Sequence, residues 1–165
     1  MTVHEVDATT EALLTASRAL VAVAARSLAG VDVTLPQFRG LVMLTRPGPV
    51  MVGDLAQALD VHPSTATRLC DRLERKGLVR RHPGVASDRR ETTVTLTAQG
   101  HRLVSRVTER RRRDLAAIAA AMTPEARAHA LIGLTAFADA AGELPASDAF
   151  GWAGGTDERG PVSRG

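Results

Sequence analysis

The chain has 165 residues, of which 44% are hydrophobic and 24% charged, a balance typical of one soluble globular domain with a buried core. No apolar run approaches the ~18 residues of a membrane span, and the first residues are acidic where a signal peptide would be basic, so we expect a cytoplasmic protein without membrane contact. A net charge of +3 permits an anionic partner, and the single cysteine, Cys70, excludes a disulfide within the chain.

The first part of the chain predicts three helices. Apolar residues recur at a spacing of three or four over residues 9–29, and Gly30 is suited to end this first helix. Thr34, followed three residues later by Gln37, forms the capping-box pattern that opens a second helix. A short third helix is expected over residues 52–59.

A fourth helix and a hairpin follow. Proline is tolerated in the first turn of a helix, so we expect a helix from Pro63 to Lys76, which Gly77 ends in a left-handed conformation. Alternating and β-branched residues predict short strands over 78–81 and 90–96, joined by a long loop.

The C-terminal part predicts two more helices and a tail. Thr97 is placed to cap a long helix over 98–121, and Thr123 opens a last helix. The overall class is therefore mainly α with a small β-hairpin (α+β). Beyond Leu144 the composition is rich in Gly, Pro, Ser and Asp, which predicts a flexible tail. We divide the chain into an N-terminal dimerisation helix (1–30), a central DNA-binding unit (31–97), C-terminal dimerisation helices (98–143) and the tail (144–165).

Positive charge is concentrated in residues 61–97. Eight arginines and lysines against four acidic residues leave +4 there, more than the net charge of the whole chain. A basic patch is typical of nucleic-acid binding, although basic surfaces also serve solubility. Proteins that bind single strands or RNA stack bases on aromatic rings, and this segment contains none. The composition therefore favours duplex DNA.

A short helix, a tight turn, a second helix and a hairpin, in this order, define a winged helix-turn-helix. The second helix needs an apolar face for docking and a small, polar face for the major groove. The residues suited to the groove lie near its start: Ser64, Thr65, Thr67 and Arg68. Arg72 lies one turn further along, where it can reach a phosphate. An ordinary amphipathic helix would show the same pattern, so the hairpin has to decide between the two interpretations.

The hairpin carries Asp88, Arg89 and Arg90 at the entry of its second strand. The negative potential of the minor groove attracts arginine. Asp88, two residues before Arg90, can orient that arginine through a charge-assisted hydrogen bond. The alternative for this pair alone is a surface ion pair worth less than about 1 kcal/mol.

The spacing Asp88-x-Arg90, followed after five residues by Leu96 and Thr97, resembles the wing signature of the MarR family of bacterial regulators. The stretch VHPSTATRLCDRLERKGLVRR (61–81) is similar to the recognition helix and first wing strand of that family. The flanking helices also match in order and length. The resemblance implies a homodimeric repressor that binds a palindromic operator in double-stranded DNA and dimerises through its terminal helices. It also implies that a small aromatic or phenolic ligand releases the operator.

Carried over by position, the family's major-groove contacts fall on Ser64, Thr65, Thr67 and Arg68. Arg90 then enters the minor groove with Asp88 orienting it. One departure is His62, which stands where serine is common as the helix cap, and this leaves a capping contribution of ~1 kcal/mol in doubt. The alternative function is a winged-helix module for protein contact or non-specific DNA binding, without ligand control.

Two further residues have competing interpretations. Cys70 lies on the apolar face of the fourth helix, where cysteine behaves as a small hydrophobe and not as a redox sensor. Arg111 interrupts an apolar stripe on the long helix that we expect to form a dimer seam: Val104, Val107, Leu115, Ile118 and Met122. A buried arginine there needs a carboxylate or an acidic ligand, whereas an arginine that reaches the edge of the seam needs neither.

No motif of an enzyme is present, and no histidine or cysteine pair has metal-ligand spacing. We therefore expect neither catalysis nor a cofactor nor a metal.

Overall fold

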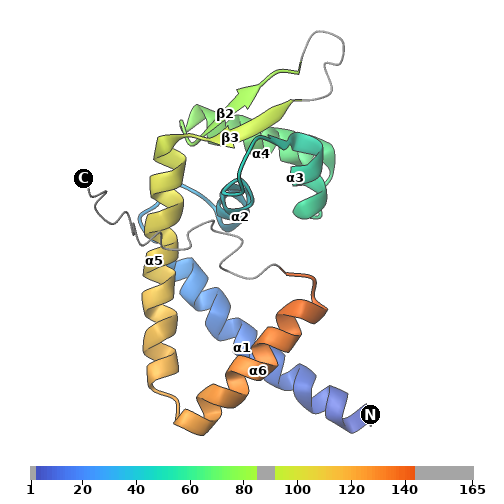
Figure 1. Ribbon diagram of the computed structural model, residues 1–165, viewed down its shortest axis with the longest axis vertical. Coiled ribbons are helices and arrows are strands. Elements are labelled where there is room, and N and C mark those ends of the chain that lie inside the picture. The colour runs from blue at the N-terminus through green and yellow to red at the C-terminus, as the bar shows by residue number, and fades with distance from the viewer. Residues whose placement is uncertain (1–2, 85–91, 144–165) are drawn as a thin grey trace, which may run out of the picture.

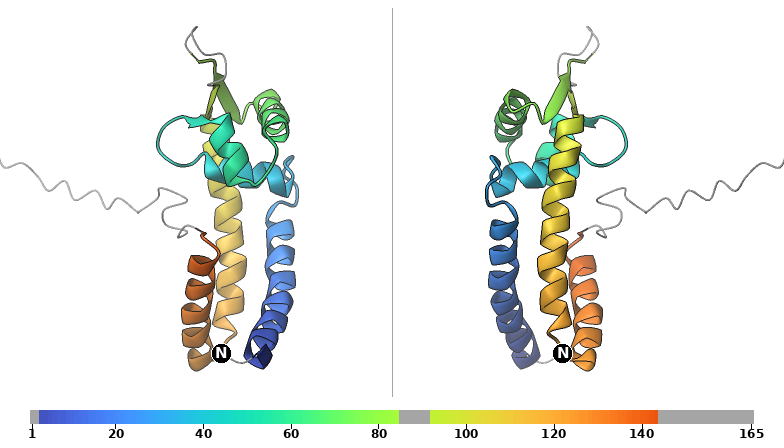
Figure 2. Two further views of the ribbon diagram at one scale, coloured as in Figure 1. Left: turned by 90° about the vertical axis from the view of Figure 1, so that its right-hand side faces the viewer. Right: turned by 90° about the vertical axis from the view of Figure 1, so that its left-hand side faces the viewer.

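The structure, a computed structural model, describes residues 3–84 and 92–143. Its elements follow in this order: α1 (Val3–Ser27), α2 (Leu35–Met43), β1 (Val50–Met51), α3 (Val52–Ala58), α4 (Pro63–Arg75), β2 (Val79–His82), β3 (Thr93–Leu96), α5 (Ala98–Ala120) and α6 (Pro124–Ala140). α2, α3, α4 and the strands form a head at one end of the long helix α5, and α1 and α6 flank the other end on opposite sides (Figures 1 and 2). The predicted class, mainly α with a small β wing, is confirmed.

The strands form one antiparallel sheet in the order β1-β3-β2. β2 and β3 make the stem of the predicted wing, with Val79 opposite Leu96 and His82 opposite Thr93. β1 was not predicted, because two residues after a proline-glycine turn are too short to show an alternating pattern. The tip of the wing and the tail from residue 144 onward lie outside the described residues.

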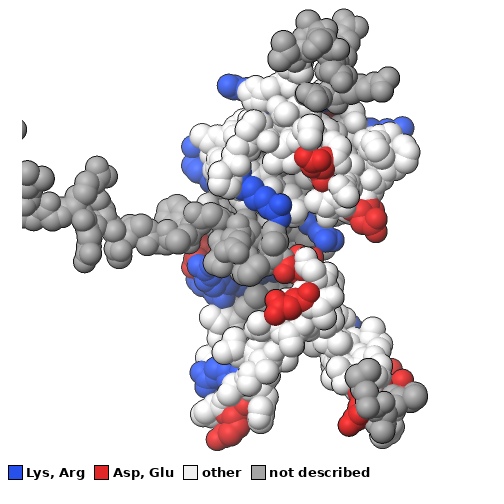
Figure 3. Space-filling view, turned by 45° about the vertical axis from the view of Figure 1, so that its right-hand side comes forward, with Lys and Arg blue, Asp and Glu red and all other residues white. Residues whose placement is uncertain are grey.

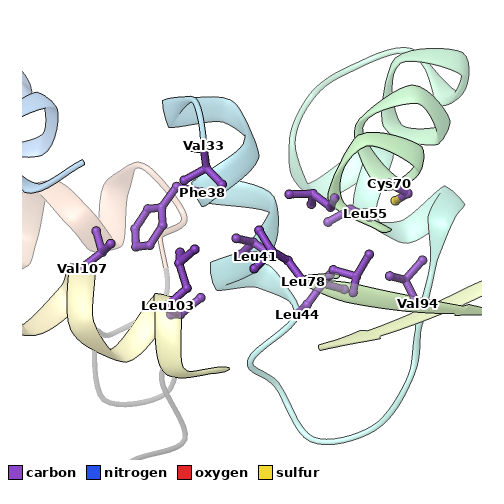
Figure 4. Packing of buried hydrophobic residues seen from close by; sticks show 13 residues of the cluster. Val33, Phe38, Leu41, Leu44, Leu55, Cys70, Leu78, Val94, Leu103 and Val107 are labelled. Carbon is purple, nitrogen blue, oxygen red and sulfur yellow. The ribbon is translucent and has the colours of Figure 1, made fainter. Parts of the chain in front are cut away.

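The core lies between the helices of the head and the first half of α5. Leu41 of α2 and Leu55 of α3 are fully buried (Figure 4), as is Leu73 of α4. Val104 and Val107 belong to the same cluster, so this half of the expected dimer seam was wrongly assigned. The physical reason is that the start of α5 packs against α2 within the chain, which the periodicity of one helix cannot reveal.

Tight contacts join the start of α5 to the end of α4. The hydroxyl of Thr97 accepts from the N–H of Gly100 at 3.1 Å and donates to the carbonyl of Gly77 at 2.7 Å. The N–H of Thr97 donates to the carbonyl of Leu78 at 3.0 Å. Gly100 packs so closely that a Cβ there would overlap the Leu78 carbonyl oxygen. The head and α5 are therefore joined without a flexible linker.

α1 and α6 leave much apolar surface uncovered. α6 has no buried residue, and its large side chains are half exposed or more: Leu131, Ile132, Leu134 and Phe137. α1 contacts α5 through its last turns, where Val23 and Ala24 are buried, whereas Leu14 and Val21 are more than half exposed. On the face that Figure 3 shows, most of the surface of the two arms below the head is uncharged, with a few separate patches of Lys, Arg, Asp and Glu. In residues 3–84 and 92–143, no helix is long and apolar enough to cross a membrane.

Candidate nucleic-acid interface

The N-terminus of α4 is capped by a histidine. Nδ1 of His62 accepts from the backbone N–H of Ser64 at 3.3 Å and lies 2.9 Å from the Ser64 hydroxyl. The imidazole of His62 therefore caps the helix, at a position where we expected serine to be the better cap. Pro63, the first residue of the helix, has no N–H to satisfy, so the cap and the proline together begin the helix cleanly.

One face of α4 is buried and the other is open. Ala66, Cys70 and Leu73 are buried in the head, as their spacing predicted. Ser64, Thr65 and Arg68 are exposed on the outer face, and Thr67 is half buried. The Thr67 hydroxyl donates to the Pro63 carbonyl at 3.0 Å, which leaves its oxygen lone pairs and methyl group to meet a ligand. The outer face can thus offer small polar groups and one guanidinium to a groove.

The basic residues of the head fall into two groups. Arg72, Arg75 and Arg80 are exposed, and of these Arg75 donates from Nε to the Asp71 carbonyl at 3.4 Å. Lys76 and Arg81 are half buried and committed to partners within the chain. From the sequence alone, these cations could not be told apart, because the partners of Lys76 and Arg81 lie on other segments of the chain.

Lys76 connects the end of α4 to the loop between α1 and α2. Its Nζ lies 3.0 Å from Oδ1 of Asp32 and also donates to the Asp32 carbonyl. It lies 3.5 Å from Oε1 of Gln37, the residue that completes the α2 capping box with Thr34. Lys76 therefore has three oxygen acceptors within hydrogen-bonding distance, two of them from Asp32.

Arg81 connects β2 to α4. Its guanidinium forms an ion pair with Asp71, and its backbone N–H donates to Oε1 of Glu74 at 3.1 Å. Asp71 and Glu74 were not among the expected functional residues. Their spacing of three on α4, beside the strand that follows, was the only sequence signal of a shared face.

Cys70 is buried at the back of the same helix. Burial raises the pKa of its thiol to about 11, while Arg81 opposes this effect and Asp71 and Glu74 add to it. The thiol is therefore protonated at neutral pH and packs as an apolar group, as expected. Asp88, Arg89 and Arg90, the expected wing contacts, lie outside the described residues.

A cavity of about 810 Å³ opens between α2 and α5, away from the outer face of α4. Its lining is mostly apolar: Leu35, Phe38, Val42, Leu115, Ala116 and Ala119. Arg111 is half buried in this cavity and faces no described carboxylate partner within salt-bridge distance, and Arg39 and Arg112 lie at its walls. The buried hydroxyl of Thr108 lacks a hydrogen-bond partner among the described residues. Arg111 thus lines this cavity together with Leu115 of the same stripe.

Fold and surface together define a winged helix-turn-helix protein: the head has the required helices and wing stem, and the outer face of α4 is polar and basic. The sequence pattern of the MarR family matches residues 33–92, and the chain belongs to this family. In the described ranges, no group of three or more His, Cys, Asp and Glu is placed to hold a metal ion.

Known proteins extend this similarity over more of the chain. The structure of RV1404 from Mycobacterium tuberculosis superposes with a TM-score of 0.76 at 46% identity, covering 86% of this chain and 97% of that one. The HTH-type transcriptional regulator YfiV of Bacillus subtilis is 30% identical over 63% of this chain. The HTH-type transcriptional repressor MdtR of the same organism is 37% identical over 41%. The matches span 64% and 43% of the length of these two curated relatives. Both are named as regulators of transcription, which agrees with the expectation for this chain.

Proposed function

We propose that the protein is a sequence-specific regulator of transcription that binds double-stranded DNA as a homodimer and represses until a small ligand releases it. The observation that carries this proposal is the outer face of α4. Small polar residues and Arg68 lie exposed at its N-terminal end, while its opposite face is fixed in the core. This is the arrangement that a helix needs to enter a major groove.

Selection of duplexes from a random-sequence pool tests specific DNA binding. We expect an enriched inverted repeat whose half-sites lie about 10 base pairs apart, because two heads related by twofold symmetry meet one face of DNA. The enriched duplex should bind ~10³-fold more tightly than random DNA at equal salt. A ratio near one would instead support the alternative, a non-specific or protein-binding module.

The homodimer is supported by apolar surface that the chain does not cover by itself. Leu131 and Ile132 on α6 are 70% and 69% exposed, and Leu14 and Val21 on α1 are 51% and 59% exposed. Large apolar side chains left exposed along two helices are typical of an interaction site. The dimer would bury these helices against their copies, and sedimentation at micromolar concentration should give twice the mass of the chain. A monomer under these conditions would contradict the assignment.

The wing is proposed to bind through Arg89 and Arg90, with Arg90 in the minor groove and oriented by Asp88. Arg90→Ala should weaken binding and flatten the dependence of log K on log salt by about one unit per wing. Asp88→Ala gives the sharper test. Loss of an acid near DNA should tighten binding by charge alone, whereas loss of an orienting group should weaken it, so tighter binding would refute the orienting role.

The ligand is proposed to be an aromatic or phenolic acid held in the cavity between α2 and α5. The apolar walls suit a ring, and Arg111 forms no ion pair with any described residue, since Glu143, the carboxylate in the lining, pairs with Arg39. The Arg111 guanidinium can therefore bind the carboxylate of a ligand. Hydroxybenzoates should displace the selected duplex, whereas phenol, which lacks the carboxylate, should not. Arg111→Gln should abolish the difference between hydroxybenzoates and phenol. The control is Arg113→Gln, at an exposed position on α5, which should preserve that difference. Equal displacement by both compounds would argue against a role for Arg111.

A further inference from the structure

We propose that Arg81 is a positioning residue, which fixes the wing to the recognition helix α4 through Asp71 and Glu74 and does not itself contact DNA. The inference rests on the proposed DNA binding and assigns a role to three residues that the interface above leaves without one. On charge alone, Arg81 would be grouped with the cations that meet phosphates.

Two kinds of bond join β2 to α4 at this point. The guanidinium of Arg81 pairs with the carboxylate of Asp71, and the main-chain N–H of Arg81 donates to Glu74 at 3.1 Å. Residues three apart lie on one face of a helix, so both carboxylates meet the strand from the same side. The side chain of Arg81 is only 26% exposed, which limits its access to a phosphate.

The position of Arg81 in the sheet explains why this contact matters. Arg81 lies opposite Val94 of β3, which is fully buried, and His82 opposite Thr93 is the last pair of the described hairpin. Arg81 is therefore close to the point where the hairpin leaves the core. β2 is an edge strand of the three-stranded sheet, so its position relative to α4 depends on such lateral bonds.

Charge gives the contact a second consequence. Asp71 lies on the same helix as the residues proposed to meet DNA, and an unpaired carboxylate there would repel phosphates. If Arg81 were a phosphate contact, removing Asp71 would release it and tighten binding. If Arg81 positions the wing, removing Asp71 would weaken binding, although an acid has been lost.

Arg80 is the matched control. It is the neighbour of Arg81 on β2, but side chains alternate along a strand, so Arg80 lies on the opposite face and is exposed. No ion pair joins Arg80 to any residue in the part of the chain that the structure describes. Arg80→Gln thus removes the same charge from the same strand and leaves the contact with α4 intact.

The experiment measures affinity for the selected duplex across a range of salt concentrations. We expect Arg81→Gln and Asp71→Asn each to weaken binding about five- to tenfold, as a lost charge-assisted bond would. The slope of log K against log salt should stay unchanged for both. The double variant Asp71→Arg with Arg81→Asp, which reverses the pair, should restore affinity to within about threefold of the original.

With all variants folded by circular dichroism, three binding results would overturn the inference. They are tighter binding by Asp71→Asn, a flatter salt slope for Arg81→Gln, and no recovery of affinity in the reversed pair. Amide hydrogen exchange of the free protein provides a readout that does not involve DNA. Exchange in β2 and β3 should be faster in Arg81→Gln and Asp71→Asn but not in Arg80→Gln, and equal rates in all three would also refute the contact. Failure of the original protein to discriminate the selected duplex would refute the proposed function instead, with the exchange data still deciding the role of Arg81.

Discussion

Gly100→Ala should destabilise the protein although alanine is the better helix former. Gly100 lies in the first turn of α5, where an added Cβ would overlap the carbonyl oxygen of Leu78 and lie 3.0 Å from a methyl carbon of Leu96. The Leu78 carbonyl cannot move freely, because it accepts from Thr97 at 3.0 Å. The start of α5 has to shift away from the head, and that shift weakens this hydrogen bond.

The size of the effect follows from opposing contributions. Overpacking against a fixed backbone costs about 1–3 kcal/mol, and a weakened hydrogen bond adds about 1 kcal/mol. Helix propensity returns about 1 kcal/mol of this. The free energy of unfolding should therefore fall by about 1–3 kcal/mol, and the melting temperature by roughly 2–4 °C for each kcal/mol.

Urea denaturation followed by circular dichroism measures this change, at equal protein concentrations because the proposed dimerisation would contribute to stability. Gly53→Ala in α3 is the control, since a Cβ there meets nothing within 4 Å. It should leave stability unchanged or raise it by up to about 1 kcal/mol. If Gly100→Ala were as stable as Gly53→Ala, the close contact with Leu78 could not be present in solution.

The other predictions concern DNA, pH and assembly. Thr67→Ala and Arg68→Ala should each reduce discrimination between the selected duplex and random DNA by about 1–3 kcal/mol in competition gel shifts, whereas equal losses on both would mean phosphate contact only. Because the pKa of Cys70 is about 11 in the fold and 9.0 when exposed, the unfolded chain loses this proton first as pH rises. Stability should thus fall between pH 9 and 11 by up to ~2–3 kcal/mol in urea titrations, and Cys70→Ala should lack this contribution. Replacing Leu131 and Ile132 together with glutamate should give a monomer by sedimentation, and an intact dimer would remove α6 from the interface.

Local chemistry explains what the sequence could predict. Thr34 and Gln37 form the capping box that opens α2. Gly77, which follows the C-cap of α4, has a φ of +68°, the left-handed conformation expected of a glycine that ends a helix. Such signals lie within a few residues of one another, so one chain segment contains them completely. The helix α1 nevertheless begins at Val3 and not at residue 9, because its first turns carry too few apolar residues to mark a start.

Contacts between distant segments explain what the sequence could not predict. The stripe on α5 contains residues with two different surroundings: Val107 lies in the core beside α2, whereas Ile118 is 46% exposed. Periodicity identifies an apolar face but not what covers it. The pair of Asp71 and Arg81 is similarly invisible until α4 and β2 are packed together.

Because the junction at Thr97 and Gly100 is rigid, a rotation of α5 at its far end moves the whole head. A helix of 23 residues is about 35 Å long, and here the head that is proposed to bind DNA is fixed rigidly to one end of it. A rotation of only about 5° at the opposite end would carry the head sideways by about 3 Å over that length. Successive base pairs are ~3.4 Å apart, so this small angle moves the head by almost one step along the duplex. In a dimer whose two α5 helices are held together at the ends far from the heads, a tilt of α5 by this angle would therefore decide whether both heads meet their half-sites in register.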